Sequence, residues 1–207
     1  MSKSLANFIS YILHPGLMPT YLLATLYFFA PYTVTIEGYS VFSRLLLLLF
    51  VFLYSFLFPT LIIWWLYKRG TIGSMKLENL ADRRLPYLIT ITSLGFLTYF
   101  FYTKSILLKP TSVVLAFVLV TLIFVALVSL KWQISAHSAA IGGVLGALFI
   151  LKFRFDENAL YWPFFCALFL AGLIGSARLK LNAHTPLQVI AGLTIGLIIG
   201  IIGSLYI

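Results

Sequence analysis

Residues 111–130 read TSVVLAFVLVTLIFVALVSL, twenty consecutive residues without a charged side chain. A helix needs roughly 20 such residues to cross the hydrocarbon core of a bilayer. A helix is also favoured there because it satisfies its own backbone hydrogen bonds where no water is present. This stretch therefore predicts a transmembrane helix.

Other apolar segments lie on both sides of this stretch. Of the 207 residues, 62% are apolar or aromatic and 9% are Asp, Glu, Lys or Arg, against about a quarter charged in a soluble domain. The predicted spans are Ile9–Ala30, Leu45–Tyr67, Leu85–Tyr102, Thr111–Leu130, Ile134–Leu151, Ala159–Ala177 and Leu187–Ile207. The connections between them are short, so we predict an all-α polytopic transmembrane bundle of six to seven spans, with residues 1–207 forming a single integral membrane domain.

The charged residues are strongly unbalanced, with 14 Lys and Arg against five Asp and Glu. Such an excess favours anionic partners, and in a chain without a soluble domain it favours lipid headgroups and phosphates over nucleic acid. We therefore expect membrane lipids and a lipid phosphate substrate as partners, and no nucleic acid. The oligomeric state is left open by the sequence.

Three polar connections are expected on the same side of the membrane. They are residues 68–84, 131–137 and 178–186, and two predicted spans separate each from the next. They contain His137 and His184, whereas a lone histidine such as His14 is expected to be a polar residue at the membrane boundary. We therefore expect the functional site on this side of the membrane.

Small residues recur every fourth position in two of the later spans. The two sets are Gly192, Gly196 and Gly200, and Ala139, Gly143 and Ala147. This spacing gives flat helix faces on which two backbones can approach closely. We interpret both sets as packing devices without a chemical role.

Chemically useful side chains on the expected common side fall into three spaced motifs. These are Lys76-x6-Arg83, Ser135-x-His137 and Arg178-x5-His184. In order and spacing they resemble the type 2 phosphatidic acid phosphatase superfamily, which includes the vanadium haloperoxidases. That family is marked by Lys-x6-Arg-Pro, Pro-Ser-Gly-His and Ser-Arg-x5-His-x3-Asp. The resemblance covers about residues 70 to 207, the motif-bearing core.

The resemblance implies a metal-independent phosphatase that acts on a lipid phosphate or an isoprenoid diphosphate without a cofactor. It implies that His184 attacks phosphorus to form a phosphohistidine, while His137 gives its proton to the leaving oxygen. The negative charge that spreads over the phosphoryl oxygens in the transition state calls for cations and hydrogen-bond donors. The implied phosphate-binding residues are Lys76, Arg83, Arg84, Ser135 and Arg178.

No metal site is expected, on a separate ground. The side that carries the motifs holds only two acids, Glu78 and Asp82. A two-metal phosphatase needs a cluster of carboxylates and histidines. The composition of this side therefore agrees with metal-independent chemistry.

The chain departs from the family motifs at several positions. Arg84 stands where Pro follows the motif arginine, Ile134 and Ala136 replace a Pro and a Gly, and Gln188 stands in place of the Asp. The Asp would orient the nucleophilic histidine and stabilise its positive ring, as in a catalytic triad. A Gln carbonyl accepts the same hydrogen bond but adds no charge.

Gln188 has a second interpretation, as part of a helix start. Thr185, Pro186 and Gln188 match the N-cap, first and third positions of a helix with a capping box. Gln188 is thus either the third catalytic residue or a structural cap. The alternatives for the protein are an active phosphatase, a weakened or inactive relative that binds lipid phosphates and, less favoured, a small transporter.

The orientation in the membrane is not decided by charge. The motif side holds nine Lys and Arg against five on the other side, which favours a cytoplasmic location. Without Lys76, Arg83 and Arg178, which are reserved for phosphate, the count is six against five. The resemblance instead implies a bacterial inner (plasma) membrane with the active face toward the periplasm.

Overall fold

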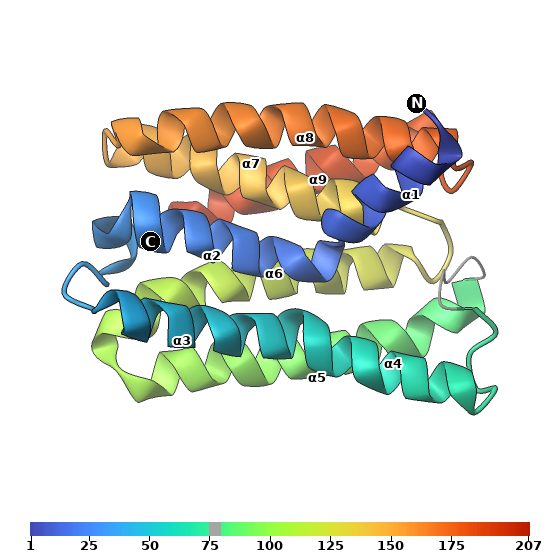
Figure 1. Ribbon diagram of the computed structural model, residues 1–207, viewed down its shortest axis with the longest axis horizontal. Coiled ribbons are helices and arrows are strands. Elements are labelled where there is room, and N and C mark those ends of the chain that lie inside the picture. The colour runs from blue at the N-terminus through green and yellow to red at the C-terminus, as the bar shows by residue number, and fades with distance from the viewer. Residues whose placement is uncertain (75–79) are drawn as a thin grey trace.

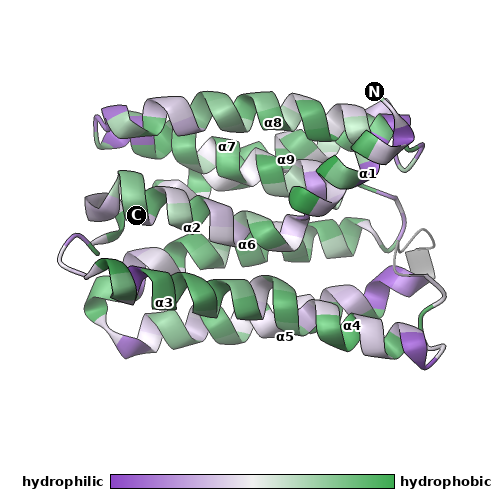
Figure 2. Cartoon of the chain, in the orientation of Figure 1, coloured by the Kyte–Doolittle hydropathy of each residue, from purple (hydrophilic) through white to green (hydrophobic). Residues whose placement is uncertain are grey.

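The computed structural model describes residues 1–74 and 80–207, and within them it is built from helices. Seven helical segments of this described part are long and apolar enough to cross a membrane. They are Lys3–Phe29, Val41–Lys68, Asp82–Lys104, Ile106–Val128, Ala136–Arg154, Asn158–Lys180 and Pro186–Ser204. The helices run along the long axis of the bundle (Figure 1), and polar residues gather at its two ends (Figure 2). The predicted all-α integral membrane fold is confirmed.

The first span is broken into two helices. It consists of α1 (Lys3–Ile12), a short 3₁₀ turn η1 (Pro15–Leu17) and α2 (Met18–Phe29). Pro15 has no amide hydrogen to continue a helix. Gly16 packs against the second span, where an added Cβ would lie 2.9 Å from the carbonyl oxygen of Ser55. The predicted first span, Ile9–Ala30, thus falls within the span Lys3–Phe29 and consists of two helices joined by a turn.

The second span contains a π-helical turn that the sequence did not predict. It consists of α3 (Val41–Phe52), the π turn η3 (Leu53–Leu57) and α4 (Phe58–Lys68). Such turns insert a residue into a helix and are frequent at functional sites. The hydroxyl of Ser93 donates to the carbonyl of Tyr54 in this turn at 2.6 Å, and Ser55 is buried in the bundle.

The remaining elements complete the bundle around one central helix. They are η2 (Pro31–Val34), α5 (Leu80–Lys104), η4 (Ile106–Leu108), α6 (Lys109–Val128), α7 (Ala136–Arg154), η5 (Asn158–Leu160), α8 (Tyr161–Lys180) and α9 (Pro186–Ser204). Of the spans, α7 is the most buried, and it packs against α8 and α9. Large apolar side chains such as Phe42, Tyr99 and Phe169 lie on the outside, as expected for helices that face lipid.

The small residues of α7 and α9 bring the two backbones into direct contact. Cβ atoms added at Gly192, Gly196 and Gly200 would overlap backbone oxygens of α7 or of its N-cap residue. The interpretation of these glycines as packing devices is therefore confirmed. The same contact joins the two helix starts, because the amide of Ser135 donates to the carbonyl of Gln188 at 3.3 Å.

Candidate active site

The starts of α5, α7 and α9 lie at the same end of the bundle, as the count of spans predicts (Figure 1). The N-terminal helix α1 lies at this end as well, against α8. The residues of the second and third motifs, together with Arg83 from the first, are therefore brought to one end of the molecule. Lys76 lies outside the described residues.

The spacing between Arg178 and His184 is set by the way α8 ends. Asn182 adopts a left-handed conformation with a φ of 52°, which Asn tolerates better than most residues. The amide of Ala183 then donates to the carbonyl of Arg178 at 3.1 Å, and the amide of Asn182 donates to the carbonyl of Leu179 at 3.0 Å. This pattern is a Schellman motif, which reverses the chain within a few residues of Arg178.

The start of α9 is fixed by a capping box. The hydroxyl of Thr185 accepts from the amide of Gln188 at 3.4 Å, and the side-chain carbonyl of Gln188 accepts from the amide of Thr185 at 3.0 Å. His184 directly precedes this N-cap. Its ring thus lies at the positive end of a helix, where an anion is favoured.

His184 is held in one tautomer by a backbone carbonyl. Its Nδ1 lies 2.9 Å from the carbonyl oxygen of Gln133, and because a carbonyl can only accept, Nδ1 carries the proton. The neutral ring therefore has its lone pair on Nε2. Burial and then the charge of Arg178 lower the pKa of His184 to about 4, against weaker opposing effects of the Gln133 carbonyl and the Gln188 side chain.

Ser10 of α1 connects two further motif residues, His137 and Arg178. Nε2 of His137 donates to the backbone carbonyl of Ser10 at 3.2 Å, and Nη1 of Arg178 donates to the hydroxyl of the same residue at 3.4 Å. Ser10 itself is buried. A helix outside the three motifs thus positions both His137 and Arg178.

One cavity of about 880 Å³ joins these groups. Its polar lining includes Lys3, Asn7, Ser10, His14, Arg83, Gln133, His137, Arg178 and His184. Its apolar lining includes Leu22, Leu94, Phe117, Leu122 and Val144, which belong to α2, α5, α6 and α7. The cavity therefore combines cations and histidines with an apolar wall in the membrane-spanning part of the bundle.

The Nε atom of Arg178 is buried without a hydrogen-bond partner among the described residues. Such an orphaned donor in a native structure calls for an acceptor, and a phosphate oxygen would suit it. Arg83, only 8% exposed, lines the same cavity. The described part of the chain contains no group of three or more His, Cys, Asp or Glu that could hold a metal ion.

Three predicted site residues do not line the cavity. Ser135 is fully buried, and its hydroxyl accepts from the amide of Ser138 at 3.3 Å and from its hydroxyl at 2.9 Å, which caps α7. Gln188 forms the capping box of α9. Arg84 is exposed and lines a separate pocket between α5 and α6.

The N-terminal segment contributes residues that the motifs did not indicate. His14, which we expected at the membrane boundary, lies in the cavity with its ring centroid 5.8 Å from that of His137 in an edge-to-face contact. Its Nδ1 accepts from the amide of Gly16 at 3.1 Å. The signal that indicates this face is the recurrence of polar residues at positions 3, 7, 10 and 14, which is a helical spacing.

Comparison with known proteins gives one match. Residues 129–207 match the family model of the PAP2 superfamily. No curated protein and no solved structure matched the chain. The matched segment contains His137, Arg178 and His184, whereas Ser10 and Arg83 lie in the preceding part of the chain.

Proposed function

We propose that the protein is a membrane-embedded, metal-independent lipid phosphate phosphatase, because residues 129–207 match the family model of the PAP2 superfamily. The observation that carries the proposal is the convergence of His137, His184, Arg83 and Arg178 on one cavity. Two cations and two histidines in a partly apolar chamber suit a phosphate group attached to a lipid.

In the proposed reaction the phosphate oxygens bind Arg83 and Arg178, including the buried Nε of the latter. Nε2 of His184 attacks phosphorus, and the bond from phosphorus to the lipid oxygen breaks. His137 gives a proton to that leaving oxygen. Because Nε2–H of His137 is bonded to the Ser10 carbonyl, the transferred proton comes from Nδ1.

A water molecule completes the cycle. His137, now neutral, takes a proton from this water as the water oxygen attacks phosphorus. The bond from phosphorus to Nε2 of His184 breaks, which releases inorganic phosphate and returns both histidines to their starting states. Arg83 and Arg178 stabilise the negative charge in both steps.

The other predicted residues take supporting parts in this proposal. The carbonyl of Gln133 orients His184, the task of the Asp in the resembled family, and Gln188 fixes the start of α9. Ser135 fixes the start of α7. Lys76, which precedes Arg83 at the family spacing, keeps its proposed role in binding phosphate, on the strength of the resemblance.

The apolar wall indicates which part of the substrate enters the bundle. The apolar side chains of this wall lie in membrane-spanning helices and belong to Leu94, Phe117, Leu122 and Val144. The acyl or isoprenoid chain of a lipid makes favourable contacts with such side chains. We therefore propose that the phosphate occupies the end near His184 and that the chain runs along this wall. Lipid monophosphates and isoprenoid diphosphates share this chemistry.

The direct test measures phosphate release from phosphatidic acid in mixed micelles by the purified protein, with a metal chelator present. We expect release of inorganic phosphate and an alkali-stable phosphoenzyme, both abolished in His184→Ala and retained in His14→Gln, which removes the third histidine of the cavity. Phosphate release by His184→Ala at the wild-type rate would refute the proposal. Binding of the lipid without turnover would instead favour a non-catalytic relative.

The location and orientation belong to the same proposal. We propose that the protein resides in a bacterial inner membrane with the His184 end toward the periplasm. In a Cys166→Ser background, Lys180→Cys lies at the His184 end and Asn158→Cys at the opposite end. A membrane-impermeant thiol reagent added to intact spheroplasts is expected to label only the first variant, and the reverse pattern would overturn this orientation.

A further inference from the structure

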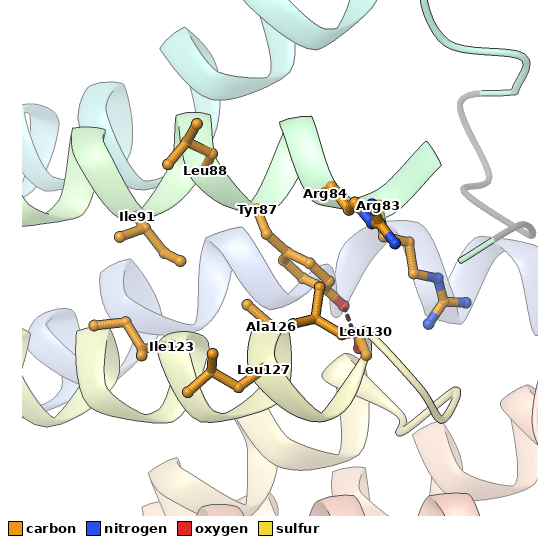
Figure 3. Close-up of a pocket in the computed structure, with 10 residues that line it drawn as sticks. Arg83, Arg84, Tyr87, Leu88, Ile91, Ile123, Ala126, Leu127 and Leu130 are labelled. Carbon is orange, nitrogen blue, oxygen red and sulfur yellow. Dashed lines mark hydrogen bonds between the residues drawn. The ribbon is translucent and has the colours of Figure 1, made fainter. Parts of the chain in front are cut away.

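A second pocket lies on the outer face of the bundle between α5 and α6. It has a volume of about 220 Å³. Figure 3 shows that Leu88 and Ile91 of α5 face Ile123 and Leu127 of α6 along the pocket. Arg83 and Arg84 lie at one end of the pocket. The pocket is thus apolar along most of its length and cationic at one end.

The cationic end of the pocket lies where both membrane spans end, at the membrane surface. Arg84 lies two residues after the start of the span Asp82–Lys104, and Leu130 lies two residues after the end of the span Ile106–Val128. From Arg84 to Ile91 a helix rises about 10 Å. The arginines therefore lie at headgroup depth, and the apolar side chains extend from there into the hydrocarbon.

The lining also shows a preference for negative charge. Its polar members are Arg83, Arg84, Tyr87 and Ser129, whose hydroxyl donates to that of Tyr87 at 3.4 Å (Figure 3). None of the described residues that line this pocket is acidic. Asp82, the nearest acid in sequence within the described residues, lies instead beside Gly73.

We propose that this pocket is a binding site for an anionic membrane phospholipid. One acyl chain lies between Leu88 and Ile91 of α5 and Ile123 and Leu127 of α6, and the phosphodiester binds Arg84. The site is distinct from the catalytic cavity, and its ligand is not a substrate of the proposed reaction because a phosphodiester lacks the terminal phosphate group.

Arg83 and Tyr87 line both the pocket and the catalytic cavity. A lipid bound outside α5 therefore contacts the same helical turn that carries Arg83 toward His184. Binding of the lipid stabilises this turn against the bundle. The pocket also gives a place to Arg84, the motif residue that the catalytic cavity does not use.

The test is competition between phosphatidylglycerol and phosphatidylcholine for the purified protein, measured by native mass spectrometry. One juxtamembrane cation gives about a fivefold preference for an anionic lipid. We expect this preference in the wild type and in Arg84→Lys, and its loss in Arg84→Ala. Leu127→Trp, which fills the pocket, is expected to lower the binding of both lipids.

Matched controls separate this site from general effects of charge and bulk. Arg69→Ala removes a cation from the same polar connection, where Arg69 stacks on Trp65 away from the pocket. Val120→Trp places the same large side chain at an exposed position of α6 that does not line the pocket. Both are expected to bind lipid as the wild type does. Retention of the preference in Arg84→Ala, or an equal loss in either control, would overturn the proposal whether or not the protein is a phosphatase.

Discussion

The Nδ1 atom of His184 lies 2.9 Å from the carbonyl oxygen of Gln133, which belongs to the connection before α7. A backbone acceptor thus holds the ring in the tautomer that leaves Nε2 unprotonated. In the resembled family an Asp four residues after the histidine has this task. Gln188 occupies that position here, and its side chain is bonded to the amide of Thr185.

Gln188→Ala is therefore expected to affect stability more than catalysis. Loss of one half of the capping box costs roughly 0.5–1 kcal/mol of stability. The value of kcat/KM should stay within about threefold of wild type, because the carbonyl of Gln133 still holds the ring of His184 in its tautomer. Denaturant unfolding in micelles and phosphate release measure the two effects. Gln188→Glu keeps the box and serves as control, and a hundredfold loss of rate at unchanged stability would assign Gln188 a catalytic role.

The pH dependence of His184 follows from its environment. Its pKa is lowered to about 4, whereas an unfolded histidine titrates near 6.5. Between these values the unfolded chain binds more protons than the folded one, so the contribution of the neutral ring to stability is present above pH 6.5 and is lost as the pH falls toward 4. His184, the proposed nucleophile, likewise stays neutral down to about pH 4.

Carbethoxylation of His184, which requires the neutral ring, measures this titration directly. In the background His14→Gln, His137→Gln, the reaction is expected to have a midpoint near pH 4. Addition of Arg178→Gln should raise the midpoint but leave it below 6.5, because burial is the larger cause of the shift. A midpoint at 6.5 in the protein that retains Arg178 would contradict the structure.

Ser10→Ala tests whether α1 positions the catalytic groups. The substitution removes the hydroxyl that accepts from Arg178 and keeps the carbonyl that accepts from His137. Loss of about 1 kcal/mol from this hydrogen bond lowers kcat/KM about fivefold. Ser10→Thr should restore the rate, and Ser4→Ala on the same helix should not change it. Equal effects of all three substitutions would assign α1 a purely structural part.

Gly196→Ala tests the contact between α7 and α9. The added Cβ would overlap the carbonyl oxygen of Ala139, so the helices must separate, at a cost of about 1–3 kcal/mol. Because the same contact joins the starts of both helices, activity should fall together with thermal stability. Gly172→Ala on α8 has open space around the new Cβ and should affect neither. Wild-type activity in a destabilised Gly196→Ala protein would separate packing from the site.

Leu122→Trp tests the apolar wall of the cavity. The larger side chain would occupy space proposed for the lipid chain, so kcat/KM for phosphatidic acid should fall by about tenfold or more. Hydrolysis of a small soluble monoester such as phenyl phosphate should be unchanged. Phe124→Trp, which lies on the outside of the same helix, is the control. An equal loss with both substrates would indicate a misfolded site instead of a blocked chain pocket.

Much of this fold could be predicted because long apolar runs have few alternatives. The run from Thr111 to Leu130 and its counterparts predicted the spans, and the spacing of Arg178 and His184 indicated two residues that line one cavity. The π turn around Ser55 could not be predicted, since the apolar run from Leu45 to Tyr67 has no residue pattern that distinguishes it from a regular helix. Nor could Gln133, which acts through a backbone carbonyl that every residue possesses.

The arrangement of the two helices in the first span could not be predicted from hydropathy. Pro15 and Gly16 interrupt an apolar run that is long enough to span, and composition alone favours continuity. The amphipathic spacing of Lys3, Asn7 and Ser10 was present in the sequence but competes with the stronger hydropathy signal. Only the packing of α1 against α8 shows that its polar face turns toward His137.

The residues that line the cavity come from two different parts of the chain. His137, Arg178 and His184 lie in the segment that matches the PAP2 superfamily, whereas most of the apolar wall comes from residues before 129. In the proposed function, the residues that react and the residues that contact the lipid chain are therefore encoded in different parts of the sequence. Shared motifs alone therefore do not identify the substrate. A screen for the proposed lipid substrate should vary the lipid chain as widely as the headgroup.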